Sequence, residues 1–172
     1  MSASIRLAVA ADAAQIAEIY NQAILERTAT FETAVRTAAD MRSGLLDPSR
    51  HPTLVAECGE QVIGWASLST YRARACYSGI AEFSIYLDRE ARGLGTGRIL
   101  LGALIDAALE RGYWKLVSRV FPANVASRAL CRACGFREVG VYEKHGWLDG
   151  RWVDVVIVER MIPENLTRPV SS

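Results

Sequence analysis

The sequence predicts one α+β (α/β) domain, with a central mixed, mostly antiparallel sheet of about seven strands and about four helices. Three observations lead to this prediction. Strand-like and helix-like segments follow one another in mixed order, a glycine-rich loop opens the longest apolar helix, and no repeat or low-complexity segment interrupts the chain. The length of 172 residues fits roughly one domain. We expect the domain to span residues 1–163 and a flexible C-terminal tail to span residues 164–172.

The elements of the N-terminal half follow from periodicity. We expect a strand over residues 4–9, a first helix that begins at Asp12 and a second helix over 38–46. Two strands, over 53–57 and 61–69, should then form a hairpin. Asp12 precedes Gln15 by three residues, which is the spacing of a capping box. The first helix then carries its apolar side chains on one face, at Ile16, Ile19, Tyr20, Ala23 and Ile24.

The second half is read in the same way. We expect helices over residues 97–111 and 124–134. The strands of this half are expected over residues 80–87, 115–121, 137–143 and 152–160. The helix over 124–134 ends at Gly135, a residue type that favours the end of a helix. These elements complete the seven strands and four helices of the predicted domain.

Composition excludes several classes of protein. The chain is 51% hydrophobic with only 5 prolines, which excludes a disordered or collagen-like protein. Its formal net charge of +1 disfavours binding to nucleic acid or to a membrane surface. The most apolar stretch, residues 99–109, is far shorter than the ~20 residues of a membrane span. The N-terminal apolar run is too short for a signal peptide, so we expect a cytoplasmic protein.

The cysteines predict neither a disulfide scaffold nor a metal site. Cys131 and Cys134 have the C-x-x-C spacing, but no second ligand pair accompanies them. The only histidines, His51 and His145, lie far from both in the sequence. We therefore expect two ordinary helix-face cysteines and no bound metal.

The loop Arg92-Gly93-Leu94-Gly95-Thr96-Gly97 carries the clearest chemical signal. Alternate glycines allow main-chain N–H groups to point into one concavity, and the helix that follows adds its positive N-terminal end. A pyrophosphate fits such a site, with Arg92 and Arg98 as flanking cations. The glycine spacing departs from the dinucleotide fingerprint, and the loop lacks the Lys-Ser or Lys-Thr ending of a P-loop. The alternative is a glycine-rich turn without a ligand.

Two spaced motifs resemble the GCN5-related N-acetyltransferases, the GNAT superfamily. The glycine loop matches the R/Q-x-x-G-x-G/A pyrophosphate loop of that family, between the fourth strand and the long helix. Asn124-Val-Ala-Ser127, followed by Gly135-Phe136, matches the family's second motif. The resemblance covers about residues 4–160 and implies the GNAT fold, in which the fourth and fifth strands splay apart around acetyl-CoA.

Further segments are similar to the phosphinothricin and methionine sulfoximine N-acetyltransferases of that superfamily. They are Ile19-Tyr20-Asn21, Tyr71-Arg72-Ala73-Arg74 with Tyr77, the strand over residues 82–87, and residues 150–155. This resemblance implies acetylation of the amine of a small acidic amino-acid analogue, as in resistance to phosphinothricin, methionine sulfoximine or arsinothricin. It also implies a homodimer. The natural acceptor is left open.

The resemblance also assigns residues to the cosubstrate. The main chain of Ile85, Tyr86 and Leu87 would contact the thioester and the pantetheine arm. The other cosubstrate positions are Arg92, Gly93, Leu94, Gly95, Thr96, Gly97 and Arg98 for the pyrophosphate, with Asn124 and Ser127 for the arm. A strand-edge amide could also polarise the thioester carbonyl.

On the acceptor side, the resemblance makes Glu82 the candidate general base, direct or through a water molecule. The alternative for Glu82 is a structural ion pair with an arginine. Arg72 and Arg74 are the candidate anchors for an acidic substrate, because a guanidinium binds such anions in a bidentate way; they could equally be solvated charges. The remaining candidates for the pocket lining are Tyr77, Phe31 and Thr28.

One position departs from the family pattern. Where many members have a tyrosine that protonates the leaving thiolate, this chain has Cys131, so the general acid is Cys131, water or another group. Two other readings of the function also stay open. One is acetylation of a different acceptor, such as a protein N-terminus or a polyamine, and the other is a CoA-binding sensor without turnover.

Overall fold

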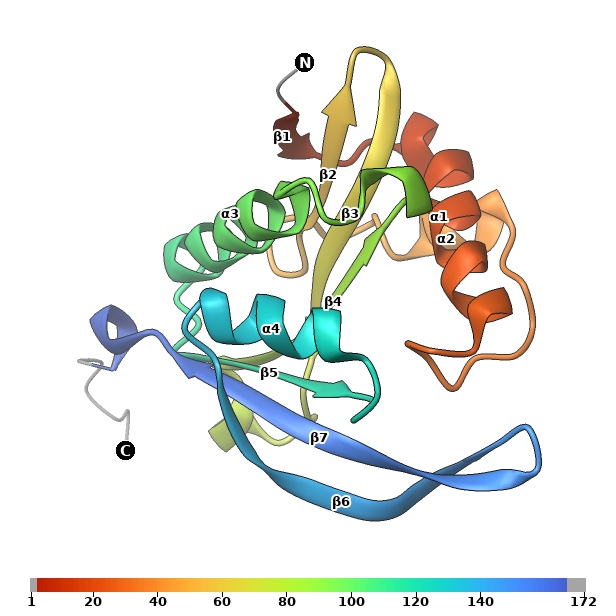
Figure 1. The fold of residues 1–172 in the computed structure, drawn as a ribbon. Helices are drawn as coiled ribbons and strands as arrows, with labels where there is room; N and C mark the ends of the chain where they lie inside the picture. The colour runs from red at the N-terminus through yellow and green to blue at the C-terminus, as the bar shows by residue number, and fades with distance from the viewer. Residues whose placement is uncertain (1–2, 167–172) are drawn as a thin grey trace.

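A computed structural model describes residues 3–166 of the chain. Its centre is a single seven-stranded sheet in the order β1-β2-β3-β4-β5-β7-β6 (Figure 1). The strands are β1 (Ser4–Leu7), β2 (Thr53–Cys58), β3 (Gln61–Thr70), β4 (Ile80–Leu87), β5 (Lys115–Val120), β6 (Arg137–Leu148) and β7 (Arg151–Met161). Every neighbouring pair is antiparallel except β4 and β5, which run parallel. The predicted mixed, mostly antiparallel sheet is confirmed.

Helices cover both faces of this sheet. They are α1 (Ala13–Glu26), α2 (Ala38–Ser43), α3 (Thr96–Glu110) and α4 (Val125–Ala133). Consecutive residues of β2 show the two layers, because neighbouring side chains on a strand point to opposite faces. Leu54 packs in the core beneath α3, and Val55 packs with Ile16 and Ile19 of α1. Short 3-10 turns at residues 10–12, 75–77, 89–91 and 163–165 complete the connections.

The feature that matters for function is the divergence of β4 from β5. The two strands pair only at their beginnings, from Ile80 opposite Lys115 to Glu82 opposite Val117. Beyond that point β4 stays paired with β3 as far as Leu87, while β5 continues beside β7. The strands therefore open into a V-shaped gap toward their C-terminal ends (Figure 1).

Three details differ from the sequence-based expectation. The final strands run to Leu148 and begin again at Arg151, so the hairpin they form is longer than predicted. The second helix ends at Ser43 rather than at residue 46. The predicted capping box at Asp12 and Gln15 is wrong. The Asp12 carboxylate accepts from the Val9 N–H at 2.7 Å and pairs with Arg6 at 2.8 Å, and the Asp12 side chain does not cap the helix.

The end of the chain is only partly described. Pro163–Asn165 forms a 3-10 turn, and the Asn165 side-chain amide donates to the carbonyl oxygens of Leu109 and Tyr113 at 2.9 and 2.8 Å. The expected tail over 164–172 otherwise lies outside the described residues from 167 onward. Within residues 3–166, no helix is long and apolar enough to cross a membrane.

Candidate functional site

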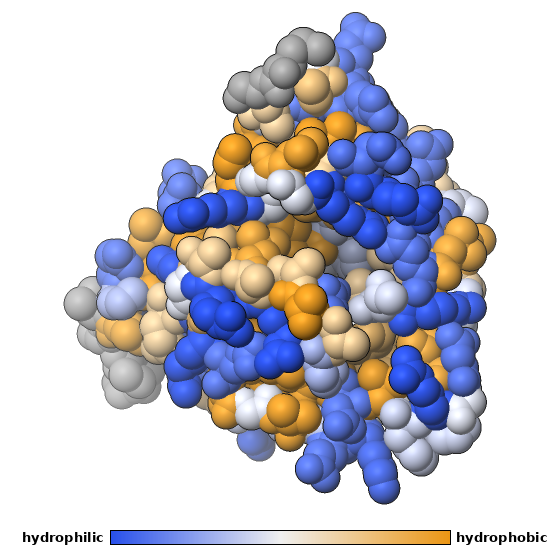
Figure 2. Space-filling view, in the orientation of Figure 1, coloured by the Kyte–Doolittle hydropathy of each residue, from blue (hydrophilic) through white to orange (hydrophobic). Residues whose placement is uncertain are grey.

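The V-shaped gap holds two adjoining cavities. The smaller, of about 400 Å³, lies between α1, the glycine loop and α4, and is called here the loop cavity. The larger, of about 660 Å³, contains Glu82 and is called the Glu82 cavity. Both are lined by Ala29, Ile85, Tyr86, Asn124 and Ser127. Figure 2 shows the surface hollowed between α1, α3 and α4, with apolar residues in the hollow and hydrophilic residues at its rim.

The loop cavity is built to hold an anion. Gly95 caps α3 in the left-handed conformation, with φ of 86°, and a Cβ there would meet no atom within 4 Å. The position therefore needs glycine for its backbone conformation rather than for space. The Arg98 N–H donates to the Gly95 carbonyl oxygen at 3.1 Å, which leaves the first two N–H groups of α3 without a partner in the helix, and the Arg92 and Arg98 side chains line the same cavity. Main-chain donors, the helix dipole and two guanidinium groups together form an anion site.

Two residues of the predicted loop set do not line that cavity. Leu94 is 75% exposed, and the side chain of Thr96 is buried at the start of α3. Any contribution from these two residues to a ligand comes from their main chain. Gly93, Gly95 and Gly97 line the cavity as the motif predicts.

The main chain of β4 supplies polar groups where the two cavities meet. At the apex of the V, the Ser118 hydroxyl of β5 donates to the Phe83 carbonyl oxygen at 2.9 Å. Phe83 thus directs its polar main-chain groups toward β5. Because these groups alternate in direction along a strand, those of Ile85 and Leu87 also face the gap, and those of Tyr86 face β3. Past the apex, β5 no longer pairs with β4, so the groups of Ile85 are available to a ligand.

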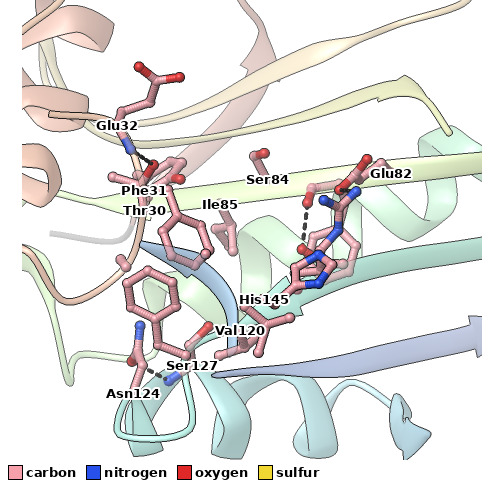
Figure 3. A pocket seen from close by; sticks show the side chains of 18 of the residues that line it. Thr30, Phe31, Glu32, Glu82, Ser84, Ile85, Val120, Asn124, Ser127 and His145 are labelled. Carbon is pink, nitrogen blue, oxygen red and sulfur yellow. Dashed lines mark hydrogen bonds and ion pairs between the residues drawn. The ribbon is translucent and has the colours of Figure 1, made fainter. Parts of the chain in front are cut away.

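Asn124 and Ser127 form the opposite wall. Asn124 caps α4, and its side-chain oxygen accepts from the Ser127 N–H at 3.1 Å (Figure 3). Both residues line both cavities. With its oxygen used in the cap, Asn124 presents its amide nitrogen as a donor to a ligand.

Glu82 pairs with an arginine in its cavity. The Arg119 Nη2 lies 2.8 Å from Glu82 Oε1, and the Glu82 side chain is 26% exposed. This ion pair is the one that the structural alternative for Glu82 expected. His145 of β6 lies on the same side of the cavity (Figure 3). Oε1 is thus the carboxylate oxygen that pairs with Arg119.

Phe31 closes the Glu82 cavity from the segment after α1. Its ring packs edge-on against Phe121, with centroids 4.8 Å apart. On its other side it lies so close to Gly146 that an added Cβ there would collide with the ring. Three segments that are distant in the sequence therefore meet around this one side chain.

The other proposed acceptor residues lie elsewhere. Thr28 lines the loop cavity rather than the Glu82 cavity. Arg72, Arg74 and Tyr77 line neither, and both arginines are exposed in the segment between β3 and β4. The pKa of Arg72 is raised, mainly by its hydrogen bond with Tyr71, and Tyr142 of β6 adds a smaller effect.

Sequence reasoning missed Arg119 and His145. Neither belongs to a short motif, and each reaches the cavity because β5 and β6 carry it there. Only the expectation that Glu82 pairs with some arginine pointed toward Arg119. No comparable signal identified His145.

Cys131 lies away from both cavities. Its side chain is 1% exposed within the core beneath α3, and burial raises its pKa to about 12. Cys131 lies one turn after Ser127 on α4 but lines neither cavity, and a thiol with a raised pKa is a weak proton donor. Cys131 is therefore a core residue, and neither its burial nor its raised pKa favours it as a general acid.

Comparisons with known proteins agree with this geometry. The sequence model described as the acetyltransferase (GNAT) family matches residues 16–136. A phosphinothricin N-acetyltransferase of Alcaligenes faecalis is 38% identical over 87% of this chain and 77% of its own. An L-methionine sulfoximine/L-methionine sulfone acetyltransferase of Pseudomonas aeruginosa is 33% identical over 98% of this chain and 100% of its own.

The solved structures extend the likeness to three dimensions. A GNAT superfamily phosphinothricin acetyltransferase from Sinorhizobium meliloti, in complex with acetyl-CoA, superimposes with a TM-score of 0.90 at 36% identity. The match covers 100% of this chain and 95% of that one.

Proposed function

The chain belongs to the GNAT family of acetyltransferases, and from that membership we propose that it acetylates the amine of a small acidic amino-acid analogue. Phosphinothricin, methionine sulfoximine, methionine sulfone and arsinothricin define the class. The chain is an acetyl-CoA-dependent N-acetyltransferase, and relatives along nearly its whole length carry the phosphinothricin and methionine sulfoximine names. The biological role that follows is detoxification.

One observation carries the proposal: the anion site and the carboxylate share a single gap. The loop cavity can hold the pyrophosphate of acetyl-CoA, and the Glu82 cavity can hold an amine beside a base. The cavities join at Ile85, whose main-chain groups face the gap. An extended pantetheine arm can bind there as an added strand, which brings the thioester to the junction.

The residues then divide the chemistry between them. Glu82 takes a proton from the ammonium group of the acceptor, directly or through a water molecule, because only a neutral amine has a free lone pair. The Ile85 N–H stabilises the negative charge on the thioester oxygen while the amine attacks the carbonyl carbon. The carbon–sulfur bond breaks, and the second proton of the attacking nitrogen passes through a water molecule to the thiolate, without a part for Cys131. Arg119 holds Glu82 in place from β5.

Cations near the Glu82 cavity favour an acidic acceptor. Arg119 in the cavity is paired with Glu82, and Arg72 with Arg74 supplies positive charge, unpaired within residues 3–166, in the exposed segment before β4. A polyamine would instead require a carboxylate-rich mouth. Arg72, Arg74 and Tyr77 reach the acceptor in this proposal once the rim closes over it.

A homodimer is part of the same proposal. The β6–β7 hairpin exposes several large apolar side chains, and Figure 1 shows it projecting beyond the rest of the sheet. They are Val139, Val141, Tyr142, Trp147 and Trp152, each about half exposed. Burial against a second copy would remove this surface from water and close the rim of the Glu82 cavity.

The test is release of CoA thiol with a panel of acceptors. Purified protein is given acetyl-CoA with phosphinothricin, methionine sulfoximine, arsinothricin, spermidine or a peptide with a free N-terminus. We expect turnover with the amino-acid analogues only. Turnover confined to spermidine or peptide would contradict the proposed substrate class, and acetyl-CoA binding without any turnover would favour the sensor.

A further inference from the structure

Glu26, the last residue of α1, lines the loop cavity and pairs with two arginines. Its carboxylate lines the cavity and is 22% exposed. Oε2 accepts from Arg92 Nη1 at 2.8 Å, and Oε1 accepts from Arg89 Nε at 3.0 Å. One acidic side chain thus neutralises part of the positive charge at the start of the glycine loop.

The contact is fixed by its surroundings. One turn earlier on α1, the Gln22 side chain accepts from the Arg89 N–H at 2.9 Å and donates to Asp88 at 2.7 Å. These two bonds hold the end of α1 against the turn that leads into the loop. The Glu26 carboxylate therefore remains beside Arg92 without further ordering, and the two arginines keep its pKa below the usual value against the effect of burial.

A fixed carboxylate in an anion site has a predictable effect. The pyrophosphate of the proposed cosubstrate is negatively charged, so it is repelled by Glu26 and must compete with Glu26 for the Arg92 guanidinium. Acetyl-CoA and the product CoA share the same pyrophosphate, so any favourable contact at the loop strengthens the binding of both molecules equally. A competing carboxylate weakens the binding of both molecules equally and shortens the time that the product CoA stays bound.

Resting on the proposed function, we propose that Glu26 is a resident counter-ion of Arg92 that lowers the affinity of the loop for the CoA pyrophosphate and so promotes release of CoA. Binding exchanges the partner of Arg92 from the carboxylate to the phosphate oxygens. No covalent bond changes in this step. The alternative is that Glu26 only orients Arg92, and it makes the opposite prediction, because loss of the orienting group would weaken binding.

The decisive variant is Glu26→Gln, which keeps the shape and removes the charge. We expect its Kd for CoA and for acetyl-CoA, measured by calorimetry, to fall about threefold to tenfold. The KM for S-acetylpantetheine, a donor without a pyrophosphate, should stay unchanged. Glu90→Gln is the matched control, because this carboxylate lies in the neighbouring 89–91 turn and makes no ion pair with Arg92. It should change the Kd less than twofold.

A double-mutant cycle with Arg92→Gln tests whether Glu26 lowers the affinity for CoA through Arg92. If Glu26 acts through Arg92, most of the gain from Glu26→Gln should disappear in the Arg92→Gln background. Should Glu26→Gln fail to fold, Glu26→Met carries the same prediction.

The outcomes separate the two proposals. A Glu26→Gln protein that binds CoA as weakly as the wild type, or more weakly, overturns the counter-ion role and leaves the proposed function standing. A gain that appears equally with S-acetylpantetheine also overturns it, since the pyrophosphate would not be involved. A wild-type protein that binds no acetyl-CoA overturns both.

Discussion

The two cavities of the gap are built in different ways. The loop cavity takes its anion site from five residues of one continuous segment, 92–98, and from the main chain at the start of α3. The Glu82 cavity takes its side chains from β4, β5, β6 and the segment after α1. One site is thus made by local backbone geometry and the other by tertiary packing.

This difference determines what a substitution can do. A backbone site depends on conformation, so it responds to changes at Gly95 and tolerates changes at exposed side chains such as Leu94. A site made of side chains depends on each side chain separately. Substitutions there can change which acceptor binds without changing how the cosubstrate binds. The comparison predicts that substitutions in one cavity leave binding in the other unchanged.

The largest expected effect is from Glu82→Gln. Loss of a general base should lower kcat by about 10²–10⁴-fold, while the Kd for CoA stays within about twofold. Steady-state kinetics and calorimetry on the same preparation measure the two quantities. Glu60→Gln, in the exposed turn between β2 and β3, is the control for loss of a carboxylate. Wild-type kcat in Glu82→Gln would leave Glu82 with only its structural ion pair to Arg119.

The same difference explains what could be predicted from the sequence. Periodicity predicted all seven strands and four helices, because each is specified by its own residues. The glycine loop could also be predicted from the sequence, since Arg92 to Gly97 is one continuous motif. Arg119 and His145 could not be found in this way, because their place in the cavity depends on how β5 and β6 cross the gap. For the same reason, the sequence could not show that Thr28 lines the loop cavity rather than the Glu82 cavity.

Phe31→Ala tests the independence of the two cavities from the acceptor side. Removal of the ring should remove its contacts with Phe121 and Gly146 and raise the KM of the acceptor by about tenfold. The KM of acetyl-CoA should not change. Leu25→Ala, a substitution of an exposed side chain on α1, is the matched control. An equal rise in both KM values would show that the two cavities are coupled.

Gly95→Ala tests the independence of the two cavities from the cosubstrate side, at the loop cavity. Alanine at a φ of 86° costs about 1–2 kcal/mol, so the loop should shift and the affinity for CoA should fall about fivefold to tenfold. Gly102→Ala is the matched control, because Gly102 lies in the same helix, has ordinary φ and has open space around its Cα. It should leave binding unchanged. If both variants bind equally well, main-chain conformation at the loop does not set the affinity.

Cys131→Ala should have the smallest effect on catalysis, and it tests the boundary of the site. The thiol lies in the core beneath α3, so its loss should lower stability by about 1 kcal/mol and Tm by about 2–4 °C. Because the side chain lines neither cavity, kcat should change less than about twofold across the pH range. Thermal unfolding and pH–rate profiles of the same variant separate the two effects. A large fall in kcat without a fall in Tm would place the thiol back beside the leaving group, and the boundary drawn between core and site would then be wrong.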